Sequence, residues 1–202
     1  MRLDVRHNVE EARKALTDVQ REHLPFAVSV ALNDIVKGLS LHMKRRMSQV
    51  LDRPVAFTRN GMGIKLSSKR NLSASVFVKD RQAAYLIWQE TGGTRTPKGK
   101  AIPVPVKIRR NAAGNMARAA VKNALARKDT FATRPGSHLP GGIYQRTGGK
   151  RRSGLKMLLA FEPKAAYRDR PLNFGETVSR LAADRLPGAL ARAISAALAP
   201  RG

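Results

Sequence analysis

Apolar residues recur every three or four positions over two long stretches of the chain. The first stretch predicts an amphipathic helix over about residues 25–51, because Pro25 suits a first helical turn and Pro54 stops the pattern. The second predicts a helix over 174–199, which Pro187 and Gly188 should kink or split in two. The apolar stripe of the first helix is formed by Val28, Leu32, Ile35, Leu39, Met43, Met47 and Val50.

A shorter helix is expected before Pro25. Asn8 and Glu11 have the spacing of a capping box, and Val9, Ala12, Leu16 and Val19 follow at helical intervals.

The middle of the chain instead alternates apolar and polar residues over short runs bounded by Gly and Pro, which is typical of strands. Strands are predicted at 55–58, at 62–66 after the hairpin signal Asn60-Gly61, and at 72–78, 143–146 and 155–161. Residues 101–108 should form an edge strand, because Pro103 and Pro105 cannot donate to a ladder. Residues 81–90 fit a short helix or a strand, and we favour the helix. A helix is also predicted at 115–128, a loop at 129–142 and an exposed hairpin tip at 147–154.

These elements predict an α+β fold, with a long N-terminal helix and a C-terminal helix packed on a mostly antiparallel sheet. The length of 202 residues suits one domain. Within it we expect a helical part at 1–51, a strand-rich basic region with a helix at 52–164, and the C-terminal helix within 165–202.

The distribution of charge along the chain adds the most to this interpretation of the fold. The chain carries 39 Lys and Arg residues against 14 Asp and Glu, and 24 of these cations against five acids lie in residues 51–164. Such a region repels itself, so it either forms a solvated surface or faces an anionic partner. At this density we favour the anionic partner, which is either nucleic acid or an acidic protein surface.

Catalytic patterns are lacking. The histidines have no HExxH or other ligand spacing, no GxSxG elbow occurs, and the glycines before Lys100 do not have P-loop spacing. The carboxylates of residues 51–164 are scattered among cations, and there is no cysteine. We therefore expect that the protein is not an enzyme and that it binds neither a cofactor nor a metal ion. No stretch approaches the roughly 18 to 20 apolar residues that span a bilayer, so no membrane partner or secretion signal is expected either.

Cations beside flexible glycines can contact phosphates without reading sequence. No signature of a known nucleic-acid-binding module accompanies them, and most aromatic residues fall on apolar faces. The residues that we expect to contact DNA or a protein partner are Lys98, Lys100, Arg109, Arg110, Lys150, Arg151 and Arg152.

Five short motifs, in order, resemble the phage minor tail protein Z family of tail completion proteins. They are VLDRPVAFT at 50–58, FVKDR at 77–81, Glu90 with Gly92-Gly93, LPGGIYQR at 139–146, and the closing segment 174–198 with Arg185-Leu186-Pro187. With the long helix that precedes the first motif, the resemblance covers about residues 25–198, and the basic connection at 95–135 is the part least clearly matched.

The resemblance implies a role in assembly, not a chemistry. It implies a structural virion protein, made in the host cytoplasm, that completes the head-proximal end of a long phage tail and helps head–tail joining. It further implies self-association as a ring, expected to be a hexamer. The implied neighbours are tail terminator, tail tube or tape-measure proteins and head–neck proteins. Cations facing the lumen of such a ring would neutralise DNA. The alternative is a free, non-specific nucleic-acid-binding protein that uses the basic central region.

Overall fold

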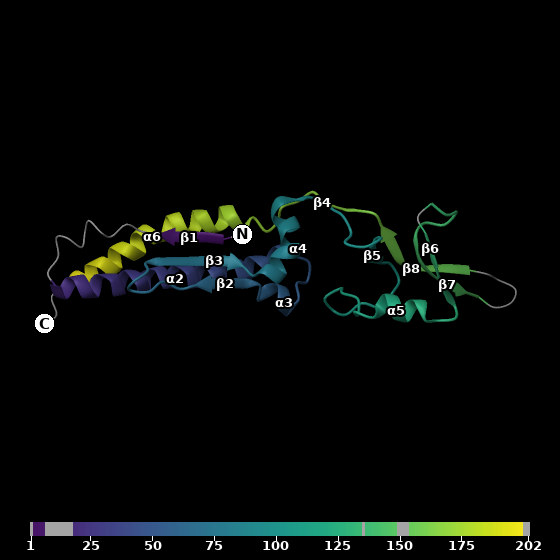
Figure 1. The fold of residues 1–202 in the computed structure, drawn as a ribbon, viewed down its shortest axis with the longest axis horizontal. Coiled ribbons are helices and arrows are strands. Elements are labelled where there is room, and N and C mark those ends of the chain that lie inside the picture. The colour runs from purple at the N-terminus through teal and green to yellow at the C-terminus, as the bar shows by residue number, and fades with distance from the viewer. Residues whose placement is uncertain (1, 7–17, 135, 149–153, 200–202) are drawn as a thin grey trace. The chain divides into compact units, whose positions relative to one another are not determined.

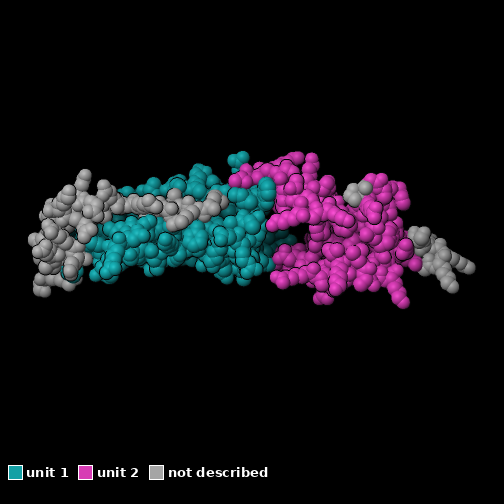
Figure 2. All heavy atoms as spheres, viewed as in Figure 1, with its two compact units in different colours: residues 1–90, 170–202 teal, residues 91–169 magenta. Residues whose placement is uncertain are grey.

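The structure is a computed structural model that describes residues 2–6, 18–134, 136–148 and 154–199. It has the α+β fold expected from the sequence, with antiparallel strand pairing throughout its described sheets (Figure 1). The chain forms two compact units (Figure 2). Unit 1 comprises residues 1–90 and 170–202, and unit 2 comprises residues 91–169. The prediction of one domain over 1–202 stays a prediction, because the division does not establish whether either unit folds alone.

Two long helices form the frame of unit 1: α2 (Asp18–Val50) and α6 (Phe174–Leu198), which pack on each other (Figure 1). The predicted stripe of α2 is the buried face, and Leu32, Leu39, Met43 and Met47 are almost completely buried. The residues of the stripe share one face of the helix because helical side chains three and four residues apart lie on the same side.

A three-stranded sheet completes this core, in the order β1 (Arg2–Arg6), β3 (Ser73–Val78), β2 (Met62–Lys65). The alternation predicted for β3 is present, because Ala74, Val76 and Val78 are buried. Val76 and Val78 join the core cluster that contains α2 and α6 residues. Ser75 is also buried, so both faces of this central strand are covered.

Polar contacts fix the start of α6. Helix α4 (Asp80–Thr91) ends beside it, and the Glu90 carboxylate accepts hydrogen bonds from Phe174 N at 2.6 Å and Gly175 N at 3.0 Å. These are N–H groups of the first helical turn, which have no partner within a helix. Arg46 of α2 donates to the carbonyls of Leu172 at 2.7 Å and Pro171 at 3.0 Å, so α2 also holds the segment before α6.

The segment His23–Val50 of α2 is long and apolar enough to span a membrane by length and composition alone, contrary to the expectation that no such stretch occurs. Half of its most apolar window is buried inside the protein. Packing within unit 1 accounts for this composition, because the core helix of a globular unit also needs a wide apolar face.

Unit 2 is built on a four-stranded antiparallel sheet in the order β5 (Ile102–Pro105), β8 (Gly154–Glu162), β7 (Gly142–Thr147), β6 (Thr130–Thr133). Its small core joins this sheet to the short helix α5 (Ala120–Leu125) through Ala124, Ile143, Leu158 and Leu159. A two-stranded sheet pairs β4 (Gly93–Arg95) with β9 (Ala165–Tyr167), near the two ends of the unit. The edge position predicted for the proline-bearing strand is confirmed by β5.

Three local predictions were wrong in unit 1. Residues 55–58 do not form a strand: α3 (Ala56–Arg59) forms there, closed by bonds from Thr58 N and Arg59 N to the Val55 carbonyl. Asn60-Gly61 therefore follows a helical turn and is not a hairpin turn; the chain connects β2 to β3 through residues 66–72. Helix α2 also runs through Pro25, which lies inside it and is buried; burial outweighs the one helical hydrogen bond that proline cannot donate.

Other predictions need smaller corrections. Pro187 lies inside a continuous α6, so the helix is not split. The helix expected at 115–128 is shortened to α5, and the loop expected at 129–142 contains β6, whose Phe131 stacks on Tyr144 of β7 at 5.8 Å between ring centroids. The helix expected at 8–19 falls mostly outside the described residues.

Candidate polyanion-binding groove

The described part of unit 2 contains an open groove of about 770 Å³ between the segment after β5, helix α5 and the inner strands of the four-stranded sheet. Five cationic side chains line it, and no Asp or Glu does. Asparagine and glutamine amides and small apolar groups form the rest of the wall. The cations are Lys107, Arg109, Arg110, Arg127 and Lys156.

The segment after β5 is held to the sheet by its backbone. The amides of Val106 and Lys107 both donate to the Leu158 carbonyl of β8, at 3.0 and 3.2 Å. Beyond it, a β-bridge joins Arg110 to Met116. Within this tight loop the Asn115 N–H donates to the Asn111 side-chain oxygen at 2.9 Å, an arrangement that asparagine side chains favour in turns. Arg109 and Arg110 therefore project from a backbone that is fixed at both ends.

Four of the five cations have no partner for their charge. The side chains of Lys107, Arg109, Arg110 and Lys156 form no ion pair or hydrogen bond within the described residues. Lys156 is half-buried on β8, directly across from Gln145 of β7, while the other three are exposed. Because none of these four charges is compensated within the described residues, an anion in the groove would be stabilised by them.

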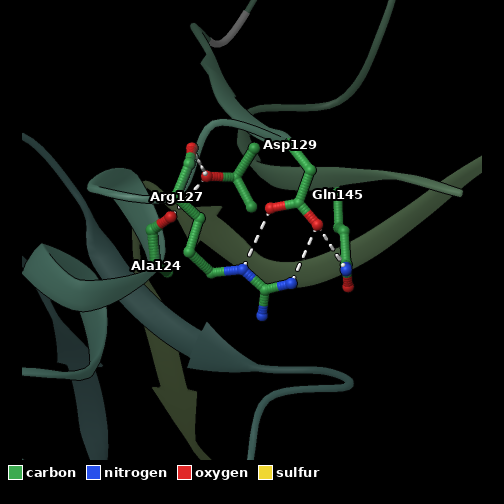
Figure 3. A network of polar contacts seen from close by, with 5 residues as sticks. Ala124, Arg127, Asp129 and Gln145 are labelled. Carbon is green, nitrogen blue, oxygen red and sulfur yellow. Dashed lines mark hydrogen bonds and ion pairs between the residues drawn. The ribbon is translucent and has the colours of Figure 1, made fainter.

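The fifth cation, Arg127, is neutralised within the protein (Figure 3). Its Nε donates to Asp129 Oδ1 at 3.0 Å and its Nη2 to Asp129 Oδ2 at 2.8 Å, and Gln145 Nε2 also donates to Oδ2 at 2.8 Å. The hydrogen bond from Arg127 is the main cause that lowers the pKa of Asp129, with that from Gln145 next. The same bond to Asp129 raises the pKa of Arg127. Both groups therefore stay charged over a wide pH range.

The groove contains part of the set predicted from the sequence. Arg109 and Arg110 line it. Lys98 and Lys100 are exposed in the connection between β4 and β5 and do not line it. Lys150, Arg151 and Arg152 lie outside the described residues.

Sequence reasoning missed Lys107, Arg127 and Lys156 as members of the groove. A signal was present for Lys156, because it is the one charged residue in an otherwise apolar strand at residues 155–161. No local pattern marks Arg127, because the fold alone brings it opposite residues 107–110.

The groove can bind an anion, but it lacks groups for acid–base or metal chemistry. No carboxylate or histidine lines it. Among the described ranges of the chain, no group of three or more His, Cys, Asp or Glu side chains is placed to hold a metal ion. Guanidinium and ammonium groups together match the oxygens of phosphate, to which arginine binds in bidentate fashion.

No protein-family model, curated protein or solved structure matches this chain. The resemblance to tail completion proteins therefore rests on the order of short sequence motifs, and the groove rests on geometry alone.

Proposed function

We propose that this protein is a structural subunit of a bacteriophage tail, and that it contacts the DNA backbone through the groove of unit 2. One observation carries the contact with DNA: four unpaired cations line a groove that has no carboxylate. Unit 2 as a whole has 18 Lys and Arg residues against three Asp and Glu, so its field favours a polyanion over a single small anion. The assignment to a tail is supported by the ordered sequence motifs.

Contacts of this kind suit a passage for DNA. Phosphate contacts neutralise and position the duplex but read no sequence, so any stretch of a genome can pass or rest against them. The proposal places several copies in a ring at the head-proximal end of the tail, six in the expected arrangement, with the grooves toward the lumen. Tail terminator, tail tube or tape-measure proteins and head–neck proteins would be its neighbours.

The role is tested on particles of the source phage by antibody–gold labelling and electron microscopy. We expect gold at the head–tail junction of intact or gently disrupted particles. Particles that lack the protein altogether would overturn the structural role, whatever the purified protein binds.

A second candidate function is free, non-specific nucleic-acid binding, and the same groove favours it. The two candidate functions predict different affinities for DNA and different states of assembly. A dedicated binder should hold duplex DNA at physiological salt as a monodisperse complex. A tail subunit should bind a single duplex weakly and mainly at low salt, and should form rings that sedimentation velocity detects.

A further inference from the structure

The Asp129 carboxylate stands beside the groove and is engaged with Arg127, one of the five cations. The Asp129 carboxylate covers the Nε and Nη2 side of the Arg127 guanidinium. That side carries two parallel donors, the geometry with which arginine binds phosphate most strongly. Arg127 Nη1 has no hydrogen bond within the described part of the chain.

We propose that Asp129 is a built-in counter-anion that withholds Arg127 from the polyanion and so limits the affinity of the groove. The inference rests on the proposed contact with phosphate and deepens it. In this arrangement the DNA backbone engages Lys107, Arg109, Arg110 and Lys156, while the pair of Arg127 and Asp129 contributes almost no net charge.

The alternative role for Asp129 would be to position Arg127 for binding, and the surrounding contacts argue against it. The backbone at Arg127 is held without the carboxylate, because the Thr130 hydroxyl shares its one proton between the Arg127 carbonyl, at 3.0 Å, and the Ala124 carbonyl. The Arg127 N–H donates to the Ala124 carbonyl at 3.4 Å. What Asp129 adds is a negative charge and the occupation of two donors.

A second bond keeps the carboxylate in this place. Gln145 on β7 donates to the Oδ2 atom that Arg127 also uses, and Gln145 itself lines the groove. The carboxylate is thus anchored to the sheet, and a phosphate must compete with it for the Nε and Nη2 donors of Arg127. Limited affinity suits a passage, since a duplex held by every cation would move through it slowly.

A double-mutant cycle tests the inference, with binding of a fluorescently labelled 20-base-pair duplex followed by anisotropy across a salt series. Asp129→Asn keeps the side-chain size and one acceptor but removes the charge. We expect it to tighten binding about two- to fivefold, as an exposed ion pair predicts. The slope of log Kd against log salt should steepen by about 0.9, the value of one added phosphate contact.

The other members of the cycle separate a counter-anion from a positioning residue. Arg127→Gln should weaken binding, because it leaves Asp129 as an uncompensated negative charge. The double variant should return to wild-type affinity, since it is as neutral as the native pair. Asp169→Asn is the matched control: it removes an exposed carboxylate of unit 2 that bonds no cation of the groove, and it should leave the slope unchanged.

Weaker or unchanged binding by Asp129→Asn, at an unchanged melting temperature, would overturn the inference. So would a double variant that binds as poorly as Arg127→Gln. Either result leaves the proposed function standing, because that depends on whether the wild-type protein binds the duplex with steep salt dependence at all.

Discussion

The two units of this protein differ in how they are stabilised. Among the described residues, 19 buried apolar side chains lie in unit 1 and only six in unit 2. Charge has the opposite distribution: unit 1 has 21 Lys and Arg residues against 11 Asp and Glu, whereas unit 2 has 18 against three. Unit 1 is therefore held by packing, while unit 2 combines a small core with strong self-repulsion.

Under the proposed function, this difference suits the two units to different tasks. A large core between two long helices suits a rigid element that neighbours can pack against. A cationic unit with a small core gains stability from whatever neutralises it, because a ligand that binds only the folded state stabilises that state. We accordingly place the polyanion contact in unit 2 and the contacts that need a fixed shape in unit 1.

The largest expected effect comes from the core of unit 2. Leu159 is fully buried in a cluster that contains three other buried residues among those described, so Leu159→Ala should cost about 2–5 kcal/mol. Hydrogen exchange should show β6, β7 and β8 unprotected while α2 stays protected. Leu155→Ala is the control on the same strand, since Leu155 is 49% exposed. Simultaneous loss of protection in both units would contradict the comparison.

The matching change in unit 1 should cost a similar energy but a smaller share of stability. Leu39→Ala opens a cavity in a core shared by α2, α6 and the sheet, at a cost of about 2–5 kcal/mol. Leu41→Ala, on the same helix with Leu41 49% exposed, should change the free energy of unfolding by less than about 0.5 kcal/mol. Denaturant unfolding followed by circular dichroism measures both. Equal effects of the two variants would show that the buried face of α2 is misassigned.

The smallest effect concerns pH in unit 1. Burial lowers the pKa of the half-buried His42 imidazole, and nearby arginines, led by Arg185 and Arg46, lower it further. The unfolded state then binds the proton more readily than the folded state. The contribution of His42 to the free energy of unfolding is therefore fully present above the unfolded pKa of about 6.5 and is lost as pH falls below it. His42→Gln should flatten the fall in melting temperature between pH 7 and 5. A slope as steep as that of the wild type would rule out this contribution.

Periodic patterns predicted the long elements. Helices α2 and α6 and strands β3, β7 and β8 follow from apolar spacing, because each buries one face or alternate residues. The short elements could not be predicted from apolar spacing. Strand β6 has four residues and depends on Phe131 stacking against Tyr144, and α3 buries no side chain at all. Tertiary contacts decide such segments, not local propensity.

The site was predictable only where its cations are adjacent in sequence. Arg109 and Arg110 stand together, so their presence in one candidate site could be expected. Lys156 and Arg127 come to the same groove through strand pairing and through the turn after α5. Their approach depends on the register of β7 against β8, which shifts by one residue between Ile143 and Tyr144. A one-residue change in register moves a side chain to the opposite face, so local sequence cannot fix this set.

The most direct test of the central claim compares two variants that lose the same charge in different units. Binding of the labelled duplex is measured across a salt series. The groove variant replaces four cations by Gln: Lys107, Arg109, Arg110 and Lys156. The control variant replaces four exposed cations of unit 1 by Gln: Arg59, Lys65, Arg70 and Lys79.

We predict that the groove variant makes the slope of log Kd against log salt shallower by about 3 to 4, as loss of four phosphate contacts requires. The control variant should keep the wild-type slope. Equal changes in both variants would mean that net charge alone governs adhesion, and would contradict the assignment of the groove as the site that binds the polyanion.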